Sequence, residues 1–183
     1  MAEWLEQETI YEGALVTLKR GRVRFDEDHI VPFDVVEHHG GVAVVPYLDG
    51  RVFLVRQPRP VVGLDLLEIP AGKLEGPDDD VIGRAQAELG EEVGYRAGRL
   101  VPATEFFVSP GYCTERIHVF LGLDLVEVES HPEVTEQIER VELSIDDVRR
   151  MLDAREFRDS KTIIGLRELL AYLDRVEGAM QRG

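Results

Sequence analysis

Apolar and polar positions alternate along the first part of the chain. Residues 15–25 and 33–38 follow a two-residue period, and the polar stretch 26–29 lies between them. A two-residue period is typical of strands that cover one face of a sheet. We therefore expect strands here, joined as a hairpin or a meander, and a break in the pattern at Gly40-Gly41.

The rest of the chain predicts further strands and a few helices. Two apolar runs flank Asp49-Gly50, which is the strongest short hairpin signal in the sequence. Apolar residues at helical spacing predict two late helices, the first capped by Ser144. The expected strands are 42–48, 51–57, 64–72, 104–112, 116–128 and 140–144, and the late helices are 145–154 and 160–180. Mixed strands with few helices predict an α/β sandwich.

Composition excludes several classes of protein. The chain has 183 residues, 44% of them hydrophobic and 31% charged, which is ordinary for a globular domain with a sizeable core. A formal net charge of −15 argues against nucleic acid as a partner, because such binding requires clustered Lys and Arg. A single Cys113, no evident signal peptide and no apolar run of about 20 residues predict a cytoplasmic protein with no membrane partner.

Three carboxylates crowd one flank of a predicted helix within 71–95. Glu88 and Glu92 lie one turn apart and Glu91 lies beside them, while a neighbouring apolar stripe would bury the helix through Ile82, Ala85, Leu89 and Val93. Like charges at this spacing repel, and a hard divalent cation such as Mg²⁺ would turn that repulsion into attraction. Taken alone, the cluster is more typical of a solvated helix face.

The order of residues in this segment resembles the box of the Nudix hydrolase family, G-x5-E-x7-R-E-U-x-E-E-x-G-U, where U is a bulky aliphatic residue. Gly72 opens the box, and the run from Glu88 to Gly94 closes it. The spacing between Gly72 and Glu88 is one residue longer than the pattern, Asp78 or Asp79 stands at the first glutamate, and Ala87 and Tyr95 replace the arginine and the final aliphatic residue. The resemblance implies the Nudix fold, a mixed β-sheet sandwiched between helices.

Features outside the box resemble the branch of ADP-ribose pyrophosphatases and nucleoside diphosphate sugar hydrolases. They are Gln57-Pro58-Arg59 before an E-I-P-A-G run, a proline sixteen residues beyond Gly94, and the acidic run 136–139. In that branch the N-terminal strands form a small β domain that crosses to the partner of a homodimer. The resemblance therefore implies an N-terminal β-strand region over 1–39, used for dimerisation, and a Nudix hydrolase domain over 40–183.

The same resemblance implies the catalytic and metal-binding residues. Glu88 and Glu92 correspond to direct ligands of Mg²⁺, or alternatively Mn²⁺, with Glu91 as an auxiliary ligand and the Ala71 carbonyl completing the shell. Glu136 is the candidate that positions or deprotonates the attacking water and also joins the metal site. Its neighbours Glu133 and Glu139 are alternatives, and without the box Glu136 would be an ordinary charged loop residue.

The substrate-binding residues are likewise implied. Arg59 matches the arginine that contacts the diphosphate or terminal ribose, and its planar fork suits phosphate. Phe33 falls where an aromatic ring stacks on adenine, although it could simply belong to the core, and His38 falls where the branch has an arginine that reaches the partner's site. Pro110 and Gly111 match the proline-containing turn, which could also be only a turn.

Two further residues have predicted supporting roles. Glu68 is expected to hold the box loop by accepting backbone N–H groups. Arg84 lies one turn before Glu88 and is expected either to take over the role of the missing box arginine or to be an exposed helix residue.

The expected activity is Mg²⁺-dependent hydrolysis of ADP-ribose to AMP and ribose 5-phosphate. The alternatives are hydrolysis of another nucleoside diphosphate sugar, such as a GDP- or UDP-sugar, and non-catalytic sensing of ADP-ribose.

Overall fold

The computed structural model describes residues 2–76, 78–129 and 138–180. The chain divides into two compact units, of which the first contains 1–40 and 106–116 and the second contains 41–105 and 117–183. The sequence predicted a boundary beside Gly40 but assigned 106–116 to the C-terminal part.

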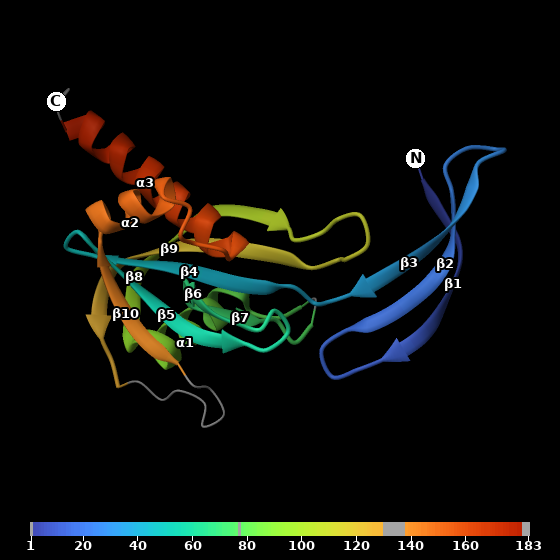
Figure 1. The fold of residues 1–183 in the computed structure, drawn as a ribbon, viewed down its shortest axis with the longest axis horizontal. Coiled ribbons are helices and arrows are strands. Elements are labelled where there is room, and N and C mark those ends of the chain that lie inside the picture. The colour runs from blue at the N-terminus through green and yellow to red at the C-terminus, as the bar shows by residue number, and fades with distance from the viewer. Residues whose placement is uncertain (1, 77, 130–137, 181–183) are drawn as a thin grey trace. The chain divides into compact units, whose positions relative to one another are not determined.

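The first unit contains a three-stranded antiparallel sheet in the order β1-β2-β3 (Figure 1). Its strands are β1 Glu3–Glu12, β2 Thr17–Arg24 and β3 Ile30–Glu37, so strands are confirmed over the region that the alternation predicted. The segment 106–116 attaches to β3 through backbone hydrogen bonds. Val36 N–H donates to the Tyr112 carbonyl at 2.7 Å, and Thr114 N–H donates to the Val36 carbonyl at 3.0 Å.

The second unit is built on a seven-stranded mixed sheet. Its main path runs β10-β5-β4-β9-β8, with β6 paired to β5 and β7 paired to β4. The strands β4 and β9 are parallel, whereas β4 and β5 form an antiparallel hairpin. Asp49 and Gly50 both have positive φ, as the predicted tight turn requires. The strands are β4 Gly41–Leu48, β5 Arg51–Arg59, β6 Leu64–Glu68, β7 Ala71–Lys73, β8 Tyr95–Phe107, β9 Arg116–Glu127 and β10 Glu139–Ser144.

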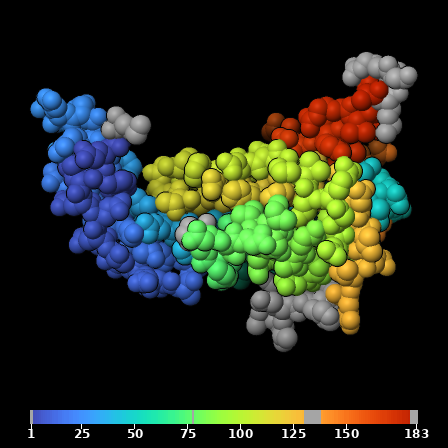
Figure 2. Space-filling model, turned by 180° about the vertical axis from the view of Figure 1, so that it is seen from behind, coloured from blue at the N-terminus to red at the C-terminus, as the bar shows by residue number. Residues whose placement is uncertain are grey.

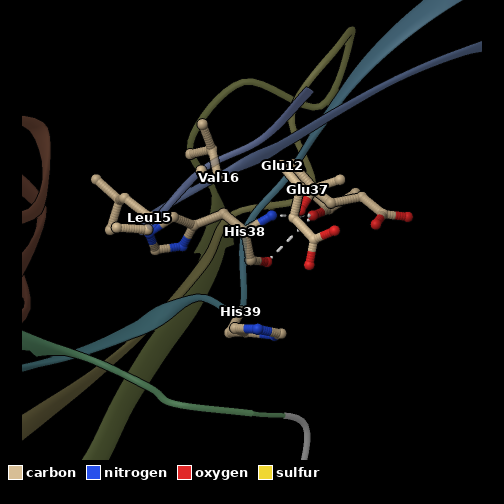
Figure 3. A pocket seen from close by; sticks show the side chains of 10 residues that line it. Glu12, Leu15, Val16, Glu37, His38 and His39 are labelled. Atoms are coloured by element: carbon tan, nitrogen blue, oxygen red, sulfur yellow. Dashed lines mark hydrogen bonds between the residues drawn. The ribbon is translucent and has the colours of Figure 1, made fainter. Parts of the chain in front are cut away.

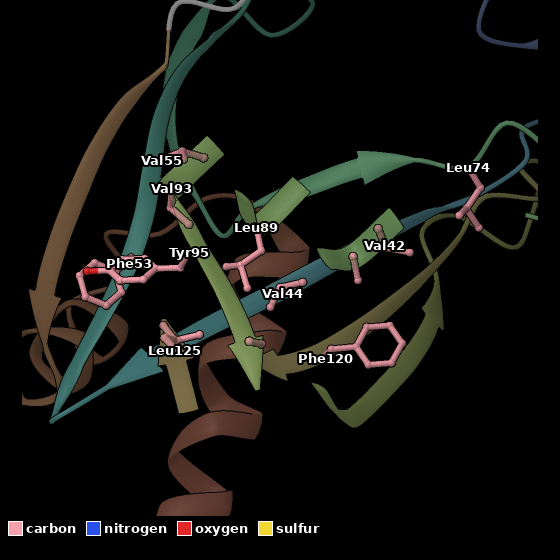
Figure 4. Packing of buried hydrophobic residues seen from close by; sticks show 12 residues of the cluster. Val42, Val44, Phe53, Val55, Leu74, Leu89, Val93, Tyr95, Phe120 and Leu125 are labelled. Atoms are coloured by element: carbon pink, nitrogen blue, oxygen red, sulfur yellow. The ribbon is translucent and has the colours of Figure 1, made fainter. Parts of the chain in front are cut away.

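Helices cover both faces of this sheet. They are α1 Val81–Val93, α2 Ile145–Asp153 and α3 Ser160–Met180. Val44 of β4 packs in one apolar cluster with Leu89 of α1 (Figure 4). Its neighbour Val45 points to the opposite face, where a Cβ on Gly165 of α3 would lie only 2.8 Å from it. The predicted mixed sheet between helices is therefore confirmed.

Some local predictions were confirmed and others were wrong. The Ser144 side chain caps α2 by accepting a hydrogen bond from Asp147 N–H at 3.1 Å, as expected. Ile82, predicted to be buried, is exposed, because the buried stripe of α1 begins only at Ala85. The strand expected to start at residue 104 begins at Tyr95 instead. No helix in the described part of the chain has the length and apolar character needed to cross a bilayer.

Candidate active site

Helix α1 carries the candidate site and is sharply bounded at both ends. The Asp80 side chain accepts a hydrogen bond from Gly83 N–H at 3.0 Å, which satisfies one free donor of the first turn. Gly94 ends the helix in the left-handed conformation, with φ of 73°, and its N–H donates to the Gly90 carbonyl. The second glycine of the box motif is thus required by the backbone conformation at the helix end.

Two of the three box glutamates lie on the inner side of α1. Glu88 and Glu92 are only 6% and 7% exposed, although both are acidic. Glu91 is half-buried. The outer flank of the helix reaches the molecular surface, as the green segment in Figure 2 shows. Burial of two carboxylates one turn apart requires compensating donors or cations, so these residues do not form a solvated helix face.

The loop before the helix contacts both buried carboxylates. Ala71 N–H donates to Glu92 Oε2 at 3.0 Å, so this glutamate is oriented by the backbone of β7. The Glu88 carboxylate lies against Gly72, where an added Cβ would fall 1.7 Å from Glu88 Oε1. The first glycine of the box is therefore needed for close approach of the loop to the helix.

Arg84 forms an ion pair with Glu88 along the helix. Its guanidinium bonds to Glu88 Oε1 in the i,i+4 geometry, and its side chain is 30% exposed. Arg84 was expected either to contact a box carboxylate or to be an exposed helix residue, and the structure shows the contact with a box carboxylate. Its effect on turnover stays a prediction.

Glu68 has different partners from those predicted. It is almost fully buried, and Arg59 donates two hydrogen bonds of 2.7 Å to its two carboxylate oxygens. Lys161, in the first turn of α3, also donates to Glu68 Oε2. The expectation that Glu68 binds the backbone of the box loop was therefore wrong, and Glu92 makes that contact instead.

The electrostatics of this cluster favour the charged forms of both partners. The hydrogen bond to Glu68 raises the pKa of the Arg59 guanidinium, and the negative charges of Asp159 and Glu92 act in the same direction. Burial opposes ionisation of Glu68, but the Arg59 hydrogen bond and the Lys161 charge outweigh it, so the pKa of Glu68 lies below its ordinary value. Arg59 is therefore close enough to Glu92 for their charges to interact.

The residues present fit a divalent cation, although they do not surround one by themselves. Within residues 2–76, 78–129 and 138–180, no three His, Cys, Asp or Glu side chains lie close enough to hold a metal ion together. Glu88 and Glu92 nevertheless supply two buried carboxylates one helical turn apart. Mg²⁺ takes oxygen ligands and usually keeps several waters or substrate phosphates in its shell. A cation held by two carboxylates and completed by water or substrate suits this donor set.

Comparison with known proteins identifies the family. The model of the NUDIX domain matches residues 37–164 of this chain. The chain belongs to the Nudix family. It is 33% identical over 168 residues to an ADP-ribose pyrophosphatase of Bacillus subtilis, which covers 90% of each protein. It is 37% identical over 135 residues to an ADP-ribose pyrophosphatase of Mycobacterium tuberculosis, covering 72% of this chain and 65% of that protein.

A solved structure shares the Nudix fold of this chain. The structure, described as an ADP compounds hydrolase, superposes with a TM-score of 0.82 and covers 94% of both chains at 20% identity. At this identity the likeness establishes the fold alone. The fold of this chain is therefore shared, over nearly its whole length, with that solved structure.

Four predicted substrate residues of this Nudix chain lie in the first unit. Phe33 is half-buried and contacts Trp4 edge-on, with ring centroids 6.0 Å apart, so it belongs to a small surface cluster of aromatic rings. Pro110 and Gly111 are exposed in a turn that Ser109 closes by accepting hydrogen bonds from Tyr112 and Cys113. Their contact with substrate stays a prediction.

The fourth residue, His38, lines a cavity of about 370 Å³ within the first unit (Figure 3). Its Nδ1 accepts a hydrogen bond from Gly40 N–H at 2.9 Å, so the proton of the neutral ring sits on Nε2. Its backbone N–H donates to Thr114 Oγ1 at 2.9 Å. The side chain is thereby held in one orientation, and its predicted role at a partner's site remains a prediction.

The acidic run expected to complete the Nudix site lies largely outside the described residues. Glu133 and Glu136 fall there. Glu139 is described and lies exposed on β10, where it pairs with Arg56 at 3.6 Å. Glu136 therefore stays the predicted residue that positions the water, with Glu133 and Glu139 as alternatives.

Sequence reasoning missed the residues at the start of α3. Asp159 accepts hydrogen bonds from Thr162 N–H and Oγ1, and Thr162 Oγ1 accepts one from Ile69 N–H at 2.9 Å. The first turn of α3 is thus fixed to the strand end that precedes the Nudix box. The capping pattern D-S-K-T could have located the helix start, but no local signal connects it to residues 68 and 69.

Proposed function

We propose that this Nudix protein is a Mg²⁺-dependent pyrophosphohydrolase that cleaves ADP-ribose to AMP and ribose 5-phosphate. The observation that carries the proposal is the pair of buried carboxylates, Glu88 and Glu92, on a box helix with its loop packed against them. Similarity over nearly the whole chain to an ADP-ribose pyrophosphatase supports the choice of substrate.

Each residue of the site has a chemical task in this proposal. A divalent ion bound here would neutralise the diphosphate and lower the pKa of a water that attacks phosphorus. Glu88 and Glu92 would hold the ion, with the Ala71 carbonyl and Glu91 as further oxygen ligands. Arg84 orients Glu88, and Ala71 N–H orients Glu92. Glu136 remains our candidate for positioning the water.

Arg59 is the proposed ligand of the diphosphate. Its guanidinium is hydrogen-bonded to Glu68 on one side, and 41% of its side chain is exposed. The negative charge of Glu92 also stabilises the charged form of Arg59. A planar fork at this place suits two phosphate oxygens. The water oxygen forms a bond to one phosphorus, and the P–O bond from that phosphorus to the bridging oxygen breaks. The bridging oxygen leaves with the other monophosphate, and a proton of the water balances its charge.

We further propose that two chains pair through the first unit in a cytoplasmic homodimer. Strand β1 is exposed along its whole length. Several large apolar side chains on this unit are exposed, namely Trp4, Leu5, Ile10, Tyr11, Leu15 and Phe25. Exposed apolar surface of this kind is typical of interaction sites, and a two-fold pair buries the same surface on both chains. The single cysteine suits a reducing compartment.

A substrate panel tests the proposed function. ADP-ribose, a GDP-sugar and a UDP-sugar are incubated with the protein and Mg²⁺, and release of AMP, GMP or UMP is followed by chromatography. AMP release from ADP-ribose above all others is expected. Preferential release of GMP or UMP would transfer the proposal to another nucleoside diphosphate sugar. Binding of ADP-ribose with no product would identify a sensing module.

A further inference from the structure

Glu68 has one more cation than its own charge requires. It is only 1% exposed at the end of β6 and accepts hydrogen bonds from both Arg59 and Lys161. One buried carboxylate and one cation would already be a neutral pair. Asp159 Oδ1 lies 3.0 Å from Lys161 Nζ and balances the additional positive charge. If Arg59 leaves, Glu68 therefore still has a cationic partner in Lys161, which it shares with Asp159.

The two cations differ in their freedom. The Arg59 side chain is 41% exposed, and the negative charge of Glu92 acts on it. Lys161 is 13% exposed and is held by Glu68 and Asp159 together. Arg59 can therefore turn toward a ligand in solvent, whereas Lys161 stays with Glu68.

The position of Lys161 is itself fixed by hydrogen bonds around the first turn of α3. Asp159 accepts hydrogen bonds from Thr162 N–H at 2.9 Å and from Thr162 Oγ1 at 2.6 Å, which closes the first turn of α3. Thr162 Oγ1 in turn accepts a hydrogen bond from Ile69 N–H, the residue directly after Glu68. The lysine and its carboxylate partner thus sit on segments joined to each other.

We propose that Lys161 is a positioning residue that keeps Glu68 paired with a cation while the Arg59 guanidinium moves from Glu68 to the diphosphate of the substrate. The inference rests on the proposed function of Arg59 as a diphosphate ligand. Without Lys161, departure of Arg59 would leave a buried, unpaired carboxylate, which is strongly unfavourable. Glu68 would then retain Arg59, and the substrate would compete poorly for it.

The test compares Lys161→Met, which removes the charge, with Lys161→Arg, which keeps it. Calorimetry measures the dissociation constant of ADP-ribose without divalent metal, and KM and kcat are measured separately with Mg²⁺. Lys161→Met is expected to weaken binding about tenfold, the equivalent of about 1.4 kcal/mol. KM should rise by a similar factor while kcat changes less, and Lys161→Arg should keep most of the affinity.

A second substitution separates this role from a purely structural one. Glu68→Gln introduced into Lys161→Met should restore affinity, because a neutral amide neither retains Arg59 nor needs a counter-ion. A merely structural role predicts further loss in the double variant. Should Lys161→Met alone fail to fold, the double variant is compared with Glu68→Gln, and equal affinities are expected.

The inference is overturned by wild-type affinity in a folded Lys161→Met protein, or by lower affinity in the double variant than in either single variant. These results are distinct from failure of the proposed function. Binding that responds to Lys161 without any hydrolysis would reject the hydrolase and keep the inference. Hydrolysis of ADP-ribose with an affinity and KM that do not change in Lys161→Met would keep the hydrolase and reject the inference.

Discussion

Gly72 and the Glu88 carboxylate are in direct contact, so that a Cβ at position 72 would lie 1.7 Å from Glu88 Oε1 and 2.2 Å from its Cδ. No side chain larger than hydrogen fits there while Glu88 keeps its position. The contact joins the loop and the helix of the Nudix box at one of its two buried carboxylates.

Replacing Gly72 with alanine should therefore disable the site. The added methyl group forces the Glu88 carboxylate to move, and displacement of a catalytic group by about 1 Å can lower the rate about a hundredfold. Turnover of ADP-ribose and the melting temperature are measured together. Gly76→Ala is the control, since an added Cβ there meets nothing within 4 Å. Equal turnover in the two variants would contradict the prediction.

Glu92→Gln should abolish most of the activity with the fold intact. The amide keeps the shape of the side chain and an oxygen that can accept the Ala71 N–H bond, but it loses the charge that binds a cation. The rate should fall by more than the 10- to 100-fold that loss of an outer partner of a metal ligand costs. Glu142→Gln, in an exposed pair with Arg51, is the control. Normal turnover at saturating Mg²⁺ would refute the assignment.

Arg84→Ala should lower turnover more than it lowers stability. Arg84 pairs with Glu88, so its removal frees a candidate metal ligand to take other orientations. We expect turnover to fall about tenfold, while the free energy of unfolding falls by less than the about 3 kcal/mol of a fully buried pair, because 30% of the Arg84 side chain is exposed. Arg99→Ala, which breaks an exposed pair with Asp124, should affect neither strongly. Unchanged kinetics in Arg84→Ala would mean that the box functions without an orienting arginine on its helix.

The contribution of Glu68 to stability should depend on pH. Its pKa in the folded protein lies below the ordinary value of 4.5, so its charged form is favoured by folding. The stabilisation is complete above about pH 4.5 and is lost as pH falls through the folded-state pKa. Urea unfolding of the wild type and Glu68→Gln should differ by about 3 kcal/mol at neutral pH, as expected for breaking a buried pair.

That difference should begin to shrink below about pH 4.5, where the unfolded state takes up the proton, and its charge-dependent part should be lost once pH falls below the lower folded-state pKa and the carboxyl group is protonated in both states. A difference that stays constant down to about pH 3 would show that Glu68 stabilises the protein by its shape and not by its charge.

Light scattering at micromolar concentration should give the mass of a homodimer. The reason is the exposed apolar surface of the first unit, which a second copy would cover. A variant with Trp4 and Tyr11 changed to serine should shift the equilibrium toward monomer, while Val126→Ser in the second unit should not. A monomeric wild type would remove the basis for Phe33 or His38 acting at a partner's site.

The sequence by itself determined the elements whose signals are local. The hairpin at Asp49-Gly50, the Ser144 cap and the two late helices follow from turn chemistry, capping and apolar spacing, all of which act over a few residues. The box helix and the one-turn spacing of Glu88 and Glu92 could also be predicted from the sequence, because helical geometry fixes which side chains share a flank.

Only the tertiary structure decided which groups meet across distant parts of the chain. The partner of Glu68 in α3 is 93 residues away, and the carboxylate that binds Ala71 N–H is Glu92 instead of Glu68. Local patterns contain periodicity but not the pairing of charges between elements. Those pairs follow from burial, because a carboxylate enclosed by packing must find its donor or cation among whatever segments the fold brings beside it.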